Sequence, residues 1–556
     1  MHPRTASQAG ISTGCEMKTM GIGWVARQKR THLFSSLARC GDEAAVTRYD
    51  ISVRADVEQG RLEATAVLVL RALVPGVTRH CFILNSGLDV QAVAMCGERL
   101  ETRELELADA PGLKAVWVNL PKPLDGGQEE RLTFVYAGRP AGGRWAHIDE
   151  GGLRLSRRAA WYPVGAGFDS FTARVACATL PGMVAVTDGD LVSSSETVDQ
   201  AVYVWETSEP ISGLALTSGR FSVERKEHRG VDLELYLGPL LKDQATQSMD
   251  LFRGVIDAYF SMLGPPGASR FTAVLRRRYP GDEHLVRLVA ALAHETAHIW
   301  WGSPISVGFG DTWFHEALAR AMAYETVGRV LGDDARAALI HEEIDRYAAD
   351  SAIGSGAEES VLSWAKSRVL DAPRPVCIRA ALVLRLLHYT LGNEAFLETL
   401  RRHASMYRAK PSGLSEFVEI AERVSGKPIE QFVRQWLGTS ASFAYEIRNA
   451  RCIAKPGGGF MTKFALVNMA DAVGPVQADV LLAGGEWKTR EKVTLTGRDQ
   501  VLVICTKHPV SCIVLDPDAY LPNRSWRHCR ASIGPGVTGS TGSTGSTGHT
   551  EDGGRP

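Results

Sequence analysis

The chain has 556 residues, of which 45% are hydrophobic and 22% charged, with 62 basic against 63 acidic side chains. This length predicts about two to four domains, because a single hydrophobic core stops growing near about 250–300 residues. The composition excludes a wholly disordered chain, and a formal net charge of -1 gives no electrostatic footprint for nucleic acid. No run approaches about 18 uninterrupted apolar residues, so we expect no membrane partner and no membrane-spanning helix.

The amino terminus and the cysteines indicate in which cellular compartment the protein is expected. Residues 1–45 lack the apolar stretch of a signal peptide, and we interpret them as an N-terminal extension that is partly disordered. The ten cysteines are scattered, with no CxxC pair and no dense cluster, which is typical of reduced thiols in a cytosolic protein. The sequence therefore predicts a cytoplasmic protein, and no feature of it indicates an oligomeric state.

Short strands dominate the first half of the chain. Tyr49–Val53 alternates apolar and polar residues, and Ala64–Leu70 continues the β-rich pattern after a turn at Glu58–Gly60. Similar runs, separated by Gly, Pro, Asn and Asp, recur to about Leu237 without a helical stripe. We predict one all-β domain over residues 46–238, built of packed sheets.

Helices dominate residues 239–440, after which the period of two returns. A short strand is expected at Phe271–Leu275, and a small β-sandwich at 441–530. We interpret residues 531–556 as a disordered Gly/Ser/Thr tail, in which the repeat from Thr538 to Gly548 contains no core-forming residues. The predicted fold class is thus multidomain α+β. The helices expected from their spacing are Gln247–Leu263, Leu285–Trp301, Trp313–Leu331, Asp334–Tyr347, Ile378–Leu391 and Glu394–Met406.

The segment His294-Glu-Thr-Ala-His298 is the most informative one. On a helix, residues i and i+4 share a face, so both imidazoles can reach one ion. Zinc prefers nitrogen donors in a tetrahedral site, and a catalytic zinc keeps one position for water. Glu295, one residue beyond the first ligand, can accept the proton of that water. The alternative is a pair of ordinary helical histidines beside a solvated glutamate.

The surroundings favour the metal site. The helix is otherwise apolar, and a second helix beginning near Trp313 carries Glu316 on its first turns. That carboxylate can complete a His/His/Glu set. We therefore predict one Zn²⁺ per chain, bound by His294, His298 and Glu316, with Glu295 as the general base. Two weaker motifs, GxGxxG at 534–539 and a nucleophile-elbow pattern at 10–14, lack the required flanking elements and are dismissed.

At this point the sequence resembles a known family. The segment from His294 to Gly302, followed by Asp311-Thr-Trp-Phe-His-Glu316, is similar to the aminopeptidase N and leukotriene hydrolase family of gluzincin metallopeptidases. Further similarities lie in the β domain (Arg48–Val53, Trp161–Pro163, Thr187–Val192 and Ser212–Phe221), at Gly426–Leu437, and at Leu515–Asp518. The resemblance spans roughly residues 46–520 and is that of a short, divergent member of bacterial type.

The resemblance implies a saddle-like N-terminal β domain, a thermolysin-like catalytic domain and a small β-sandwich. It implies the same zinc ligands and general base, and it places Asp311 at an acidic position where a second-shell role is conceivable. The spacer between His298 and Glu316 is one residue shorter than the family's, which a loop can absorb. No large helical domain follows the sandwich in this sequence, so we expect a more open cleft.

Two departures concern substrate recognition. The family's Gly-x-Met-Glu-Asn strand, whose glutamate holds the free α-amine of the substrate, is missing before the zinc helix; Asp282 or Glu283 can substitute, although such residues more often begin a helix. The alignment also places Cys377 where the family has a tyrosine that stabilises the oxyanion, and a thiol is a weak donor. Tyr389 and Tyr407 lie elsewhere, and His315 is a less favoured replacement.

The leading hypothesis is a zinc-dependent peptidase or amidase, aminopeptidase-like, with altered recognition of a peptide or amide substrate. Its rival is a weak or inactive relative that keeps zinc and binds a peptide or partner in the old cleft. Hydrolysis of a non-peptide bond such as an epoxide has precedent in the family, but no residue here argues for it. We expect no nucleic-acid partner.

Overall fold

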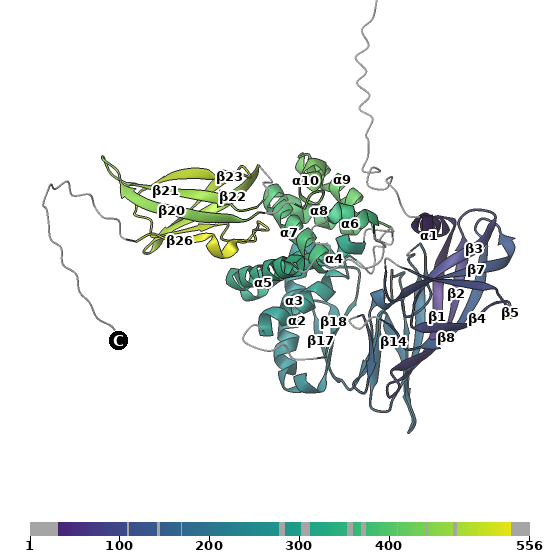
Figure 1. Ribbon diagram of the computed structural model, residues 1–556. Helices are drawn as coiled ribbons and strands as arrows, with labels where there is room; N and C mark the ends of the chain where they lie inside the picture. Colours follow the sequence, from purple (N-terminus) through teal and green to yellow (C-terminus); the bar gives the residue numbers. More distant parts are fainter. Residues whose placement is uncertain are drawn as a thin grey trace, which may run out of the picture.

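The computed structural model describes residues 32–107, 110–141, 145–167, 169–276, 284–301, 312–352, 360–367, 374–408, 410–440, 443–470 and 475–534. Figure 1 shows three parts in a row: β-sheets from the first half of the chain, a group of helices, and a second, smaller set of sheets. The predicted fold class, with an all-β start, a helical centre and a β-rich end, is confirmed.

Three sheets build the first part. The largest has eight strands in the order β14-β15-β12-β1-β2-β8-β4-β5, and two four-stranded sheets have the orders β11-β3-β7-β6 and β13-β16-β10-β9. The strands are β1 (Ala44–Asp56), β2 (Arg61–Ala72), β3 (Val77–Asn85), β4 (Leu88–Met95), β5 (Glu98–Arg99), β6 (Thr102–Glu106), β7 (Leu113–Leu124), β8 (Glu129–Gly138), β9 (Ala146–Asp149), β10 (Gly152–Leu155), β11 (Val164–Gly165), β12 (Thr172–Thr179), β13 (Val184–Thr187), β14 (Asp190–Glu196), β15 (Ala201–Glu206) and β16 (Leu216–Gly219).

Alternation in β1 and β2 directs one face of the large sheet inward. Tyr49, Ile51 and Val53 are buried while Ser52 is exposed, and β1 pairs with β2 in antiparallel register and with β12 in parallel register. The Tyr49 hydroxyl donates a hydrogen bond of 2.7 Å to the Pro163 carbonyl. That bond ties the sheet to the segment that precedes β11.

Helix α1 (His32–Glu43) precedes β1, in the region that we assigned to the N-terminal extension. It buries Leu37 and Cys40 in a small cluster with β3. Its Gly41 lies so close to Gly167 that an added Cβ would stand 2.5 Å from the Gly167 Cα, so a side chain at this position would force the backbones apart. We therefore propose that the folded part of the chain begins before residue 45.

Two further strands join the β domain to the helices. β17 (Ser222–His228) and β18 (Val231–Leu237) form a sheet with β19 (Arg270–Leu275), and β18 pairs with β19 in parallel. Four residues of β18 share one hydrophobic core with the helices: Val231, Leu233, Leu235 and Leu237. Tyr236 of β18 packs instead against Val186 and Trp205 of the β domain, and most of the buried residues of β1 to β16 form a separate core. We therefore propose a boundary near residue 221 rather than 238.

The helices lie close to their predicted positions. α4 packs against α3 and α7 (Figure 1). α3 carries His294 and α4 carries Glu316. The helices are α2 (Ala245–Leu263), α3 (His284–Ala297), α4 (Thr312–Leu331), α5 (Asp333–Ala352), α6 (Val361–Ser367), α7 (Arg374–Leu391), α8 (Asn393–Met406), α9 (Leu414–Ser425) and α10 (Ile429–Trp436).

Two small sheets close the chain, in the orders β20-β21-β24 and β23-β22-β25-β26. Their inward residues continue the core of the helical part without interruption. The strands are β20 (Tyr445–Ala454), β21 (Phe460–Asn468), β22 (Val476–Gly484), β23 (Trp487–Leu495), β24 (Gln500–Thr506), β25 (Cys512–Leu515) and β26 (Arg530–Ser532).

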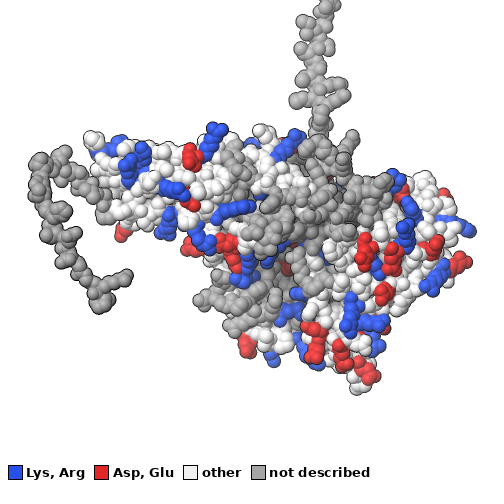
Figure 2. All heavy atoms as spheres, in the orientation of Figure 1, with Lys and Arg blue, Asp and Glu red and all other residues white. Residues whose placement is uncertain are grey.

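Charged side chains of both signs are interspersed on the face of the molecule shown in Figure 2. This agrees with the balanced composition and gives the described part of that face no field of a single sign. Within the described ranges, no helix combines the length and the apolar character needed to cross a membrane.

Candidate metal centre

The predicted zinc helix ends earlier than its sequence pattern indicated. We expected one helix to Trp301, but α3 ends at Ala297 and His298 lies in the turn that follows. This turn is tightened by i→i+3 hydrogen bonds, from the Ile299 amide to the Thr296 carbonyl (3.1 Å) and from the Trp300 amide to the Ala297 carbonyl (3.0 Å). The winding continues far enough to keep the two imidazoles together, with ring centroids 5.0 Å apart.

Glu316, from the first turns of α4, completes a group of three. Its carboxylate oxygens lie 3.4 Å from Nε2 of His294 and 3.5 Å from Nε2 of His298. Ligands about 2.0–2.1 Å from one zinc ion in a tetrahedral site are about 3.3–3.4 Å apart. The two distances involve different oxygens of Glu316, and with one ligand atom taken from each residue the three atoms lie within 4.8 Å of one another. The three side chains are thus grouped closely enough to hold one ion, and the described residues include no other comparable group of metal-binding side chains.

His298 is oriented by its second ring nitrogen. Nδ1 lies 3.0 Å from the Trp301 carbonyl oxygen, so Nδ1 carries the proton and donates it, which leaves Nε2 as a free lone pair for an ion. Burial lowers the pKa of His298; the charge of Glu316 opposes this effect and that of His294 adds to it. A neutral imidazole is the form that binds a metal.

Glu316 is held as a carboxylate. Burial alone would raise its pKa, but the hydrogen bond from His294 and the charge of Arg158 outweigh it and hold the pKa of Glu316 well below its ordinary value. Nη2 of Arg158 lies 2.8 Å from Oε1 of Glu316. Arg158 comes from the β domain, so two parts of the fold meet at this carboxylate.

Glu295 is exposed on the last turn of α3, between the two histidines in sequence. The neighbouring cation is Arg157. Burial would lower the pKa of Arg157, but the carboxylate of Asp188, followed by that of Glu295, raises it. Arg157 is fixed through its ion pair with Asp188, which in turn accepts a hydrogen bond of 2.9 Å from the Ala215 amide. The cation that feels the charge of Glu295 is thus anchored by Asp188.

Three of the acidic residues named from the sequence, Asp282, Glu283 and Asp311, lie outside the described residues. Cys377 is described and is buried near the start of α7. α7 packs against α4, and the Cys377 thiol is close enough to Arg320 to affect the pKa of that guanidinium, after the larger effects of burial, Glu343 and Tyr324. Cys377 therefore faces α4 one helical turn beyond Glu316.

The other candidate donors do not reach the metal residues. The Tyr389 hydroxyl donates a hydrogen bond of 2.6 Å to Asp479, and the ring of Tyr407 packs near His403, 5.5 Å between centroids. His315 is buried, and neither ring nitrogen has a hydrogen-bond partner among the described residues. Burial, followed by the charges of His403 and His298, lowers the pKa of His315 to about 3, so it is a neutral core residue.

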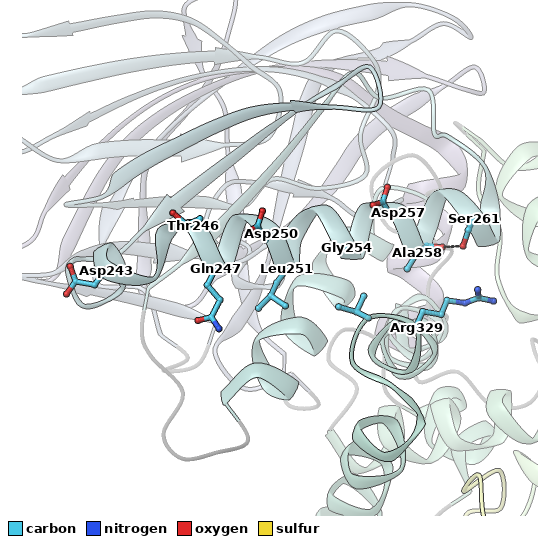
Figure 3. A pocket seen from close by; sticks show the side chains of 11 residues that line it. Asp243, Thr246, Gln247, Asp250, Leu251, Gly254, Asp257, Ala258, Ser261 and Arg329 are labelled. Carbon is cyan, nitrogen blue, oxygen red and sulfur yellow. Dashed lines mark hydrogen bonds between the residues drawn. The ribbon is translucent and has the colours of Figure 1, made fainter.

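A separate groove of about 1010 Å³ runs along α2. Figure 3 shows Asp250 and Asp257 on α2 and Asp243 in the turn just before it, with Arg329 of α4 at one end. None of the three metal residues lines this groove. Its acidic side chains are partly used in ion pairs, since Asp257 contacts His228 and Arg229.

Comparison with known proteins agrees with this geometry. Residues 276–436, which contain both histidines and Glu316, match the model of the peptidase family M1 domain. Over these residues the chain is similar to M1 peptidases. The resemblance to the aminopeptidase N-like gluzincin family is thereby confirmed. The M1 domain begins directly after β19 and ends with α10.

Curated relatives of the M1 domain are aminopeptidases and an associated factor. The chain is 23% identical to probable aminopeptidase 2 of Sulfurisphaera tokodaii, over 30% of this chain and 22% of that protein. It is 24% identical to the tricorn protease-interacting factor F2 of Thermoplasma acidophilum, over 46% of this chain and 35% of that protein. The chain thus matches only about a fifth to a third of the length of these relatives.

A solved structure shows the same fold over a longer stretch. The M1 zinc metallopeptidase of Deinococcus radiodurans aligns with a TM-score of 0.54 and 20% identity, over 71% of this chain and 94% of that one. A variant of that protein bound to a Tyr-Ser-Ala substrate aligns with a TM-score of 0.52. At this identity the likeness concerns the fold.

Sequence reasoning missed the arginines of the β domain. Arg157 and Arg158 form most of a 3₁₀ turn, η2 (Arg157–Ala159), just before the aromatic segment at Trp161. A pair of adjacent arginines next to buried aromatic residues is a visible signal in the sequence. Their partners Asp188 and Glu316 are distant in sequence, so only the folded structure identifies them.

Proposed function

We propose that the chain is a zinc-dependent metallopeptidase, aminopeptidase-like, that hydrolyses a peptide or amide bond. One observation carries the proposal: His294, His298 and Glu316 bring one ligand atom each within 4.8 Å of one another, and two histidines with a glutamate are a ligand set of catalytic zinc. The match to the M1 domain supports it, since the matched residues include all three. Zinc, when held by these side chains, would polarise the scissile carbonyl and lower the pKa of water towards about 7.

Glu295 would then perform the proton transfers. As an exposed carboxylate one residue from His294, it can take the proton of the attacking water and pass it to the leaving amine. Arg157 lies near enough to Glu295 for the carboxylate to raise the pKa of the guanidinium. His298 would stay neutral because burial lowers its pKa, and its Nδ1 donates to the Trp301 carbonyl.

We further propose that recognition of the substrate differs from that of the family's aminopeptidases. The family's amine-binding motif is missing from the sequence before α3, and Cys377 occupies the position of the oxyanion tyrosine. Loss of one oxyanion donor can lower the rate by about 100- to 1,000-fold. The same two features favour the second candidate function, a catalytically weak M1 relative that keeps zinc and binds a peptide or partner. The scattered cysteines favour a cytoplasmic location for either.

The Glu295→Gln variant decides between the two functions. Wild-type protein, Glu295→Gln and the control Glu224→Gln, an exposed glutamate on β17, are purified, their zinc content is measured, and each is incubated with peptide libraries bearing free or acetylated amino termini. We expect all three to hold zinc and Glu295→Gln alone to lose about 100- to 10,000-fold in cleavage rate. Identical products from wild type and Glu295→Gln would exclude the peptidase and favour the binding protein.

A further inference from the structure

The turn that carries Arg158 is anchored on several sides. The Ser156 amide donates a hydrogen bond of 2.8 Å to the Trp145 carbonyl, and η2 ends at Ala160, whose φ of 44° lies in the left-handed region. Asn85, almost fully buried, binds the exit of the turn: its Nδ2 donates to the Ala159 carbonyl and its amide to that of Ala160. A left-handed non-glycine residue persists only where its surroundings determine it, so the turn has a defined conformation.

The side chain of Arg158 is also fixed along its length. Its guanidinium lies over the ring of Trp145, 4.8 Å from the centroid, and only 17% of the side chain is exposed. A stacked arginine keeps its planar group in one orientation and can still donate from its edge. The edge of Arg158 meets Oε1 of Glu316 at 2.8 Å.

This contact holds one oxygen of Glu316. Oε1 pairs with Arg158 and also lies 3.5 Å from Nε2 of His298, whereas Oε2 lies 3.4 Å from Nε2 of His294. A carboxylate on a helix can otherwise rotate about its terminal torsion, since such sp³–sp² torsions are broad. With Oε1 held by Arg158, the carboxylate keeps the orientation in which its oxygens face the two histidines.

We propose that Arg158 is a positioning residue for the metal: it holds the carboxylate of Glu316 in the orientation that ligates zinc, and the β domain thereby completes the metal site of the M1 domain. This inference rests on the metal site proposed above. Partners that orient metal ligands typically contribute about 10- to 100-fold to metal affinity. Arg158 is suited to this task because its fork fixes a direction as well as a charge.

Zinc affinity of the full-length protein tests the proposal without any substrate. The metal is removed by chelation, and zinc is titrated in competition with a chromophoric chelator into wild type, Arg158→Gln, Arg158→Lys and Arg225→Gln. The last variant is the control, because Arg225 makes a similar pair, 2.9 Å to the buried Glu234, at a distant place in the β17–β18 hairpin.

We expect Arg158→Gln to bind zinc about 10- to 100-fold more weakly, Arg158→Lys to recover part of the loss, and Arg225→Gln to match wild type. An Arg158→Gln affinity within about threefold of wild type, or an equal loss in Arg225→Gln, would overturn the proposal. If Arg158→Gln does not fold, Arg158→Lys decides: a loss of less than about threefold contradicts the directional role.

The outcome is independent of the peptidase proposal. If zinc affinity depends on Arg158 but the Glu295→Gln variant gives the same products as wild type, the positioning role of Arg158 stands and the peptidase proposal is refuted. If cleavage depends on Glu295 but zinc affinity is the same with and without Arg158, the positioning role is refuted and the peptidase proposal stands.

Discussion

Arg385 of α7 joins the helical part to the C-terminal sheets, and its removal is expected to weaken that junction strongly. Only 1% of its side chain is exposed. Nε donates a hydrogen bond of 3.0 Å to the Ala519 carbonyl, and Nη2 one of 2.6 Å to that of Asp518. Nη1 forms an ion pair with Glu325 of α4, and the guanidinium lies 4.3 Å from the ring centroid of Tyr520.

The cost of Arg385→Met follows from these contacts. Burial raises the pKa of Glu325, but Arg385 and then His388 and Arg336 lower it to about 2, from the ordinary 4.5. Since each pKa unit corresponds to about 1.4 kcal/mol, the paired carboxylate contributes about 3 kcal/mol at neutral pH. Loss of Arg385 also leaves two carbonyls unsatisfied, so we expect a total cost of about 3–5 kcal/mol, as for other broken buried pairs.

Urea unfolding at pH 7 measures this cost, with the double variant Arg385→Met/Glu325→Gln as the matched comparison. The double variant should recover at least about 1 kcal/mol, because no unpaired charge remains. Because the folded-state pKa of Glu325 is depressed, its stabilising effect is full above pH 4.5 and is lost as pH falls towards about 2; Arg385→Met should show less of this acid loss. A cost under about 1 kcal/mol, or no coupling in the double-mutant cycle, would refute the reasoning.

Two further predictions concern the metal residues and a buried histidine. His294→Ala and His298→Ala should each reduce bound zinc from about one ion per chain to near zero by elemental analysis, because two ligands do not hold a structural or catalytic zinc; retained zinc would contradict the ligand assignment. Burial lowers the pKa of His80 to about 4, from 6.5, so its neutral form supports stability above pH 6.5 and this support is lost as pH falls towards 4. Between pH 6.5 and 4, His80→Leu should therefore lose up to about 3 kcal/mol less stability than wild type, whereas the exposed His508→Leu should lose as much as wild type. Equal pH profiles of the free energy of unfolding in wild type and His80→Leu would exclude the effect.

Periodicity predicted the larger elements because their burial is regular. The helix expected at Gln247–Leu263 is observed at Ala245–Leu263, and the strand expected at Phe271–Leu275 at Arg270–Leu275. The end of α3 was wrong by four residues, because the apolar pattern continues through Trp300 and Trp301 while the backbone tightens into a turn after Ala297. A hydrophobic stripe records which residues are buried, and it is similar for an α-helix and for a tighter turn of the same face.

The place of β18 required the folded structure for a different reason. The sequence pattern of Val231–Leu237 predicts one more strand of the β domain, and these residues do form a strand. Their burial, however, is against α2 and the other helices, through the parallel pairing with β19. Strand pattern gives the period of burial but not the partner that covers the face, so a boundary between domains cannot be read from it.

The metal ligands could be predicted from the sequence, whereas the side chains that orient them could not. His294 and His298 are neighbours because they are four residues apart on nearly helical backbone, and such short-range geometry is written in the sequence. Glu316 required only the next helix. Arg158 reaches Glu316 because η2, Asn85 and Trp145 place one guanidinium at the surface of the β domain that faces α4. The chemistry of the site is therefore local in sequence, whereas its rigidity depends on the contact between two separately packed cores.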